Sequence, residues 1–202
     1  GTTPCALFVT LPGYEGLYFQ GVGANLYGED FAFTAQDYLP DLIVAAPQLS
    51  DWGETSARQT IALTEHLLAQ YAIDPDRVYL EGYSGGGETG SLVLGLRPDL
   101  YTAYLAVSTH GDLAAVAQAE VPVYLAVGEA DSYYGSEPLR TAYAQLRALY
   151  EEKGLSQEAI DALLVLDVRD QAYFTQQGYT DQHAGGGAFA SDPAVMGWLF
   201  QQ

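Results

Sequence analysis

The sequence has few cationic residues. It contains 7 Lys and Arg against 26 Asp and Glu, which gives a formal net charge of −19 over 202 residues. A surface this acidic repels nucleic-acid phosphates and anionic lipid headgroups, so we expect neither as a partner. The charge is typical of a soluble protein, and the alternative interpretation is that it excludes acidic substrates.

Cysteine is almost absent, because Cys5 is the only one. A single cysteine cannot form an internal disulfide, and its apolar neighbours in residues 5–9 indicate a buried core position. Scarce cysteine fits a reducing cytoplasm and also many bacterial secreted proteins. The start Gly1-Thr2-Thr3-Pro4 carries no signal peptide and looks trimmed. The compartment therefore stays open, with a bacterial secreted or cell-envelope location slightly favoured.

Long apolar runs are missing too, and none reaches the ~18 residues that cross a bilayer. Short apolar runs alternate instead with helical patterns. Most of these runs are apolar throughout, which is typical of parallel strands covered on both faces. The predicted strands are residues 5–11, 42–46, 77–83, 103–108, 122–127 and 162–168.

The predicted helices are residues 55–72, 85–96 and 137–153, and a last helix capped by Asp192 that runs to Phe200. We expect Asp74-Pro75 to end the first of them and Gly154 to cap the third. Residues 13–30, rich in glycine and aromatics, indicate a structured loop. Alternating strands and helices predict a doubly wound, mostly parallel α/β sheet of about six strands, as one domain over residues 1–202.

One short pattern predicts a nucleophile. Gly82-Tyr83-Ser84-Gly85-Gly86 follows an apolar strand and opens a helix, which is the context of a nucleophile elbow. The sharp turn exposes the Ser84 hydroxyl, and glycines two residues away on either side let the helix pass close to the strand. A solvent-exposed turn is the structural alternative. A phosphate loop is disfavoured because no Lys-Ser or Lys-Thr pair follows.

A serine nucleophile needs a base, and the chain has three histidines. His66 lies within a predicted helix and is expected on the surface. His110 follows a strand but precedes the acid candidate, whereas the fold order is serine, acid, histidine. His183, in a late loop between the last strand and the last helix, is therefore the predicted base.

The acid is expected after the next-to-last strand, where the chain reads Gly128-Glu129-Ala130-Asp131. Asp131 is the predicted acid, because it can accept a hydrogen bond from the histidine Nδ1–H and stabilise the imidazolium. Glu129 and Asp112 are its rivals. Asp181 lies so close to His183 in sequence that shaping the loop is its expected role.

The turn after the first strand reads Pro12-Gly13-Tyr14. We expect the backbone N–H groups of Tyr14 and Gly85 to form the oxyanion hole, although Pro12-Gly13 also reads as a plain turn. Aromatic and histidine side chains that follow strands, or lie at the elbow, are candidates for the substrate pocket. They are Trp52, Tyr83, His110, Tyr133 and Tyr134, besides Tyr14 itself.

The run from Asp74 to Gly87 resembles esterases and prolyl-oligopeptidase-like hydrolases of the α/β-hydrolase superfamily. Polyhydroxyalkanoate depolymerases, feruloyl esterases and acetyl xylan esterases have a similar sequence pattern. Separately, Pro12-Gly13-Tyr14 is similar to the oxyanion turn of bacterial cutinases. Many esterases have His-Gly where this chain has Pro12-Gly13. The first strand corresponds to the third of the full fold, so the resemblance implies a minimal core.

These features favour a serine hydrolase that cleaves small or polymeric carboxylic esters without a metal or other cofactor. A serine peptidase or amidase with the same triad is the alternative. A binding module that kept only the fold is a third hypothesis, although such a module is expected to have lost a triad residue.

Overall fold

A computed structural model describes residues 3–14, 17, 20–21 and 23–202 of the chain. Its centre is one parallel sheet of six strands in the order β2-β1-β3-β4-β5-β6. This confirms the predicted fold class. The strands are β1 (Cys5–Leu11), β2 (Leu42–Ala45), β3 (Ile73–Tyr83), β4 (Ala103–Val107), β5 (Val123–Gly128) and β6 (Leu164–Arg169).

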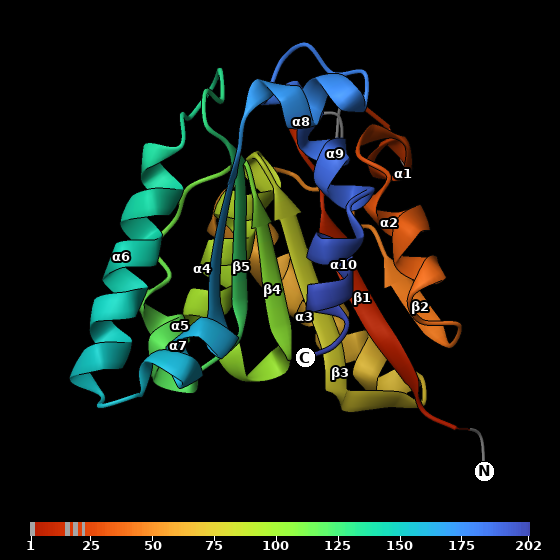
Figure 1. Ribbon diagram of the computed structural model, residues 1–202. Coiled ribbons are helices and arrows are strands. Elements are labelled where there is room, and N and C mark those ends of the chain that lie inside the picture. The colour runs from red at the N-terminus through yellow and green to blue at the C-terminus, as the bar shows by residue number, and fades with distance from the viewer. Residues whose placement is uncertain (1–2, 15–16, 18–19, 22) are drawn as a thin grey trace.

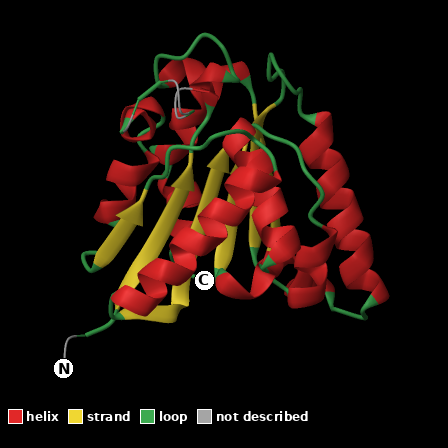
Figure 2. Ribbon diagram, turned by 180° about the vertical axis from the view of Figure 1, so that it is seen from behind, coloured by secondary structure: helices red, strands yellow, loops and turns green. Residues whose placement is uncertain are grey.

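Helices cover both faces of the sheet (Figures 1 and 2). One face packs on α3 (Glu54–Gln70), α4 (Gly85–Leu96), α5 (Ala114–Ala119), α6 (Glu137–Glu152) and α7 (Gln157–Leu163). The other packs on α2 (Phe31–Thr34), α8 (Gln171–Gln176), α9 (Gly187–Ala190) and α10 (Pro193–Leu199). The short α1 (Ala24–Gly28) precedes α2.

Two apolar clusters explain why the strand sequences are apolar throughout. Leu7, Val9 and Leu11 of β1 point to the layer of α3 and α4, while Ala6 and Phe8 point to the layer of α2 and α10. All five are fully buried, so both faces of this strand carry apolar side chains. Apolar and polar residues therefore do not alternate along it, as they do in a sheet with one exposed face. Because all the strands are parallel, their carboxyl ends lie at the same edge of the sheet.

Some local expectations were wrong. Helix α3 ends at Gln70, and Asp74-Pro75 belongs to the beginning of β3, where the pairing with β1 shifts register between Cys5 and Leu7. Such a shift accommodates a proline, which has no N–H for the ladder. Residues 162–163 close helix α7, which Ser156 caps at its N-terminus, and the strand begins only at Leu164. Cys5 is half-buried at the core margin rather than fully buried.

Other local expectations agree with the structure. Asp192 accepts the N–H of Ala194 and caps α10, and Gly154 adopts a left-handed conformation just beyond α6. Within residues 13–30, the described part contains helix α1 as well as turns. Across the described segments, no helix has the length and apolarity needed to span a bilayer.

Candidate active site

Ser84 occupies a strained turn between β3 and α4. Its backbone angles are φ 53° and ψ −122°, a conformation that costs a non-glycine residue about 1–3 kcal/mol. Hydrogen bonds hold both of its peptide groups: its N–H donates to the Val107 carbonyl at 2.9 Å, and the Thr109 hydroxyl donates to its carbonyl at 2.6 Å. The neighbouring strand β4 therefore fixes the turn that presents the Ser84 side chain.

The glycines around Ser84 are required by close packing. A Cβ on Gly82 would lie 2.6 Å from the Gly86 carbonyl oxygen, and a Cβ on Gly86 would lie 2.4 Å from the Leu11 carbonyl oxygen. Helix α4 thus starts against both β3 and the end of β1. A side chain at either position would push the helix away and change where Ser84 points.

A chain of hydrogen bonds joins the three residues that the sequence nominated. Ser84 Oγ lies 2.9 Å from His183 Nε2, and His183 Nδ1 lies 2.8 Å from Asp131 Oδ2. Asp131 follows β5, and His183 follows α8, so both reach the carboxyl edge of the sheet where Ser84 lies. The order along the chain is serine, acid, histidine.

The surroundings of Asp131 keep its carboxylate ionised. Its side chain has no exposed surface, and this burial alone would raise its pKa. The hydrogen bond and charge of His183, with two backbone N–H donors, overcome burial, so the pKa of Asp131 is below its ordinary value. These donors are Tyr133 at 3.0 Å and Tyr134 at 2.8 Å, both to Oδ1. Each carboxylate oxygen therefore has a partner.

Tyr83 and Gln182 hold the loop that carries His183. The Tyr83 hydroxyl donates to the His183 carbonyl at 2.6 Å, and the two rings stack with centroids 5.8 Å apart. Gln182 is buried and accepts the N–H of Ala130, one residue before Asp131, at 2.7 Å. The acid loop and the base loop are thereby fixed to each other as well as to the elbow.

The predicted oxyanion donors lie at the same place. Tyr14 and Ser84 line one cavity, and Gly85 is the first residue of α4, where backbone N–H groups have no partner within the helix. Trp52 covers Gly85 so closely that a Cβ there would lie 2.2 Å from the indole ring. Trp52 therefore borders the elbow, but it does not line the cavity that contains Ser84.

The cavity beside Ser84 measures about 450 Å³. It is lined by Tyr14, Gly28, Glu29, Tyr83, Ser84, His183 and Ala184. Glu29 is buried and was missed by sequence reasoning, since a carboxylate in a glycine-rich segment normally indicates a solvated loop. It gives one wall of this cavity an acidic side chain.

A second group of polar side chains lies on the His110 side of the elbow. The Tyr134 hydroxyl donates to Glu88 Oε1, and His110 Nε2 lies 3.3 Å from the same oxygen. Burial and the hydrogen bond to Glu88 raise the pKa of Tyr134. Glu88 was missed, although its position one helical turn after Ser84 places it on the same face of α4.

The remaining candidates do not line the cavity at Ser84. His110 is half exposed and contacts Glu88 and Tyr134 rather than lining the cavity at Ser84. Tyr133 is 73% exposed and its ring lies 5.2 Å from that of His183. His66 is exposed on α3.

The rival acids make other contacts. Asp112 accepts the N–H of Ala114, and Asp181 accepts the N–H of Ala184. Glu129 lines a different hollow, together with Arg140 and Arg169. In the portion of the chain that the structure describes, no three His, Cys, Asp or Glu side chains are grouped as a metal site.

Residues 48–178 match the profile of the prolyl oligopeptidase family. The chain belongs to this family. The match begins just before α3 and includes the elbow and the acid loop, while His183 lies just beyond it. No curated protein matches the chain.

Solved structures share the α/β-hydrolase fold. A thermostable esterase superposes with a TM-score of 0.76 at 21% identity, over 100% of this chain and 55% of its own. Oligopeptidase B from Leishmania major gives 0.63 at 13% identity, over 98% of this chain and 32% of its own. Esterase PE8 gives 0.58 at 20% identity, over 83% and 84%. The chain therefore spans about half the thermostable esterase and a third of oligopeptidase B.

Proposed function

We propose that this protein is a serine hydrolase that cleaves carboxylic esters through an acyl-enzyme on Ser84. The observation that carries the proposal is the unbroken line of hydrogen bonds from Asp131 through His183 to Ser84 at a strained elbow. Ser84 has a positive φ, a backbone conformation that normally favours glycine. Such strain is concentrated at functional sites.

Acylation begins when the Ser84 hydroxyl attacks the ester carbonyl carbon. His183 Nε2 takes the hydroxyl proton as the new C–O bond forms. The negative charge that develops on the carbonyl oxygen is stabilised by the backbone N–H groups of Gly85 and Tyr14. Collapse of this intermediate breaks the bond to the alcohol, which leaves with the proton from His183.

Deacylation repeats these steps with water as the nucleophile. His183 removes a proton from water, whose oxygen attacks the acyl carbon, and then returns the proton to Ser84 as the acid is released. Asp131 holds the His183 ring by its Nδ1–H and stabilises the imidazolium formed in both halves. Its lowered pKa keeps it ionised for this task at neutral pH.

Ester substrates are favoured for two reasons. Two of the similar structures are esterases, and a cavity of about 450 Å³ suits a small acyl group. A serine peptidase or amidase is the second candidate. The family match supports it, and Glu29 in the cavity wall could face the amine of a peptide.

We also propose that residues 1–202 act as one domain, because both apolar clusters pack on one sheet.

Labelling by a fluorophosphonate probe tests the nucleophile, and a substrate panel tests the reaction. We expect the protein to be labelled and to hydrolyse p-nitrophenyl acetate faster than aminoacyl p-nitroanilides. Ser84→Ala should remove labelling and lower ester turnover by several orders of magnitude while the fold is retained. Turnover that survives in a folded Ser84→Ala variant would refute the proposal. Faster cleavage of anilides would favour the peptidase.

A further inference from the structure

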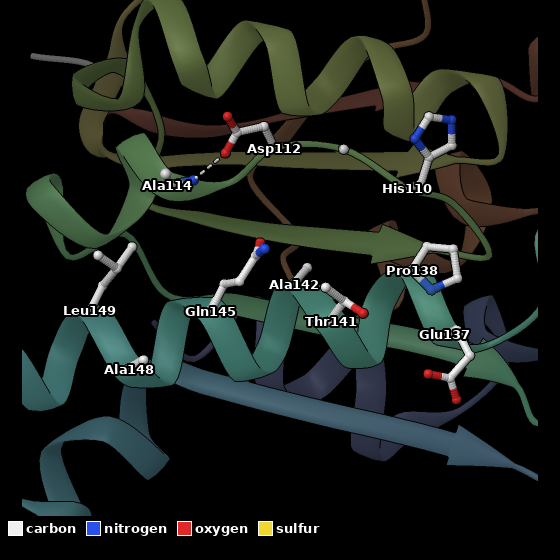
Figure 3. A pocket seen from close by; sticks show the side chains of 11 residues that line it. His110, Asp112, Ala114, Glu137, Pro138, Thr141, Ala142, Gln145, Ala148 and Leu149 are labelled. Carbon is white, nitrogen blue, oxygen red and sulfur yellow. Dashed lines mark hydrogen bonds between the residues drawn. The ribbon is translucent and has the colours of Figure 1, made fainter.

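A groove of about 910 Å³ runs between helix α6 and the segment that follows β4 (Figure 3). It begins at His110 and Pro138, near the carboxyl edge of the sheet, and ends at Ala114 and Leu149. Leu149 lies eleven positions after Pro138 on α6, so this length is about 16 Å at 1.5 Å per residue. The groove is about twice as large as the cavity at Ser84.

The chemistry of the groove suits an uncharged, apolar ligand. The α6 side contributes Pro138, Ala142, Ala148 and Leu149, with Thr141 and Gln145 as neutral polar groups. The described residues that line it include two carboxylates, Asp112 and Glu137, and no Lys or Arg. An anionic group would be repelled by these carboxylates and by the net charge of the protein.

One end of the groove meets the candidate active site. The His110 ring lies 5.0 Å from the Tyr134 ring, which in turn lies 5.6 Å from the His183 ring. The Tyr134 hydroxyl donates to Glu88, which His110 also contacts. The groove and the cavity at Ser84 have no lining residue in common, and the Tyr134 ring contacts both His183 and His110. A ligand attached to Ser84 that extends over Tyr134 therefore comes to His110, where the groove begins.

We infer that this groove binds the apolar chain of a long-chain ester whose carbonyl lies at Ser84. The inference rests on the proposed function and names its substrate class. The chain belongs either to the acid or to the alcohol of the ester, and the chemistry of recognition is the same for both. Each methylene fully buried strengthens binding about fourfold, so even partial burial along the groove distinguishes long from short esters.

The test fills the groove from its exposed side. Ala148→Trp places an indole inside it, and Ala144→Trp, on the same helix but outside this groove, is the matched control. Both alanines are exposed, so neither change disturbs the core. Values of kcat/KM are measured for p-nitrophenyl esters from acetate to dodecanoate, and for acetates of alcohols from ethanol to dodecanol.

We expect Ala148→Trp to lower the ratio of long-chain to short-chain kcat/KM about tenfold in one series, which identifies the part of the ester that enters. Ala144→Trp should leave the ratio unchanged, and short esters should react equally well in all three proteins. A ratio unchanged by Ala148→Trp in both series, or lowered equally by Ala144→Trp, would overturn the inference.

A binding measurement separates this inference from the proposed function. Neutral N-phenyl-1-naphthylamine should fluoresce on binding to wild type and Ser84→Ala, and dodecanol should displace it. Ala148→Trp should weaken the binding about tenfold, and Ala144→Trp should not. Failure to hydrolyse any ester would refute the proposed function alone, whereas equal probe binding by wild type and Ala148→Trp would refute the groove.

Discussion

The side-chain oxygen of Gln182 accepts the backbone N–H of Ala130 at 2.7 Å. Through this bond the residue before His183 holds the residue before Asp131, two positions 52 residues apart in the chain. Gln182 also packs on Gly128, where a Cβ would lie 2.4 Å from its amide oxygen. The separation of the acid from the base is therefore set by a side chain outside the proposed triad.

We predict that Gln182→Ala lowers kcat about tenfold with little change in KM, because Gln182 does not line the cavity at Ser84. The variant loses this part-buried hydrogen bond, so the free energy of unfolding should fall by about 0.5–1.5 kcal/mol. Steady-state kinetics and urea unfolding check both values. Gln177→Ala, an exposed position nearby, is the control. Equal kinetics for the two variants would show that the bond is dispensable.

The sheet could be predicted from the sequence because strands β1, β4 and β5 are buried on both faces and are therefore apolar throughout, although the edge strands β2 and β6 are only partly buried. The proposed triad could be nominated because Ser84 and Asp131 each follow a strand, His183 lies in a late loop, and the chain order of the fold is serine, acid, histidine. Ser84 is the most recognisable of the three, because Gly82, Gly85 and Gly86 surround it in the sequence. The short helices α5, α7 and α8 were missed, since each depends on a local cap or on packing rather than on a long periodic pattern.

Glu29, Glu88 and Gln182 show where sequence reasoning fails. Each is a polar side chain whose position is decided by tertiary contacts between distant segments. Glu88 alone carried a usable signal, one helical turn after Ser84. Nothing in the sequence around Gln182 indicates that it would be 4% exposed and bound to another loop.

Asp131→Asn tests the acid against its rivals. The asparagine keeps the shape but presents an amide to His183 Nδ1, which favours the wrong tautomer. The same change in the Ser-His-Asp triad of serine proteases lowers kcat about 10⁴-fold, and we expect a similar loss here. Ester turnover near pH 8, after circular dichroism has confirmed the fold, provides the measurement.

Glu129→Gln and Asp112→Asn are the matched controls, because the Asp112 carboxylate accepts the N–H of Ala114 and Glu129 lines a separate hollow. Both should retain at least about a third of wild-type kcat, since surface substitutions change stability by only about 0.5 kcal/mol. If one of them loses activity while Asp131→Asn remains active, the acid is assigned to the wrong residue.

Gly85→Ala tests the close contact between the elbow and Trp52. The new methyl group would lie 2.2 Å from the indole ring, so Trp52 or the elbow must move. Movement of the Gly85 N–H away from the developing oxyanion should lower kcat about 10²-fold, the lower bound for loss of one such donor. Overpacking should reduce the free energy of unfolding by about 1–3 kcal/mol.

Gly95→Ala, on the same helix, meets nothing within 4 Å and provides the control. It should leave kcat unchanged and stabilise the protein by up to about 1 kcal/mol, because alanine favours helix over glycine. Adding Trp52→Ala to Gly85→Ala should restore part of the lost kcat. If the double variant is no more active than Gly85→Ala, the clash with Trp52 is not the cause.

Glu81, three residues before Ser84, makes stability depend on pH. It is fully buried and accepts the Thr10 hydroxyl at 2.6 Å, while its Oε1 has no hydrogen-bond partner among the described residues. Burial raises its pKa well above the ordinary range, and Glu29 raises it further against the opposing bond from Thr10. Because the folded pKa exceeds the unfolded pKa, the folded protein binds the proton more tightly than the unfolded chain does.

The stability that this proton supplies is fully present below the unfolded pKa of about 4.3 and is lost as pH rises through the folded pKa. Glu81→Gln removes the titration and keeps an oxygen for Thr10. The unfolding free energy of the variant minus that of wild type should therefore rise with pH above about 4.3, by at most about 1.4 kcal/mol per pH unit.

Urea unfolding from pH 4 to 8 measures this difference. Glu152→Gln, an exposed carboxylate on α6, should show a flat difference over the same range. An equally flat difference for Glu81→Gln would mean that Glu81 titrates alike in the folded and unfolded chains.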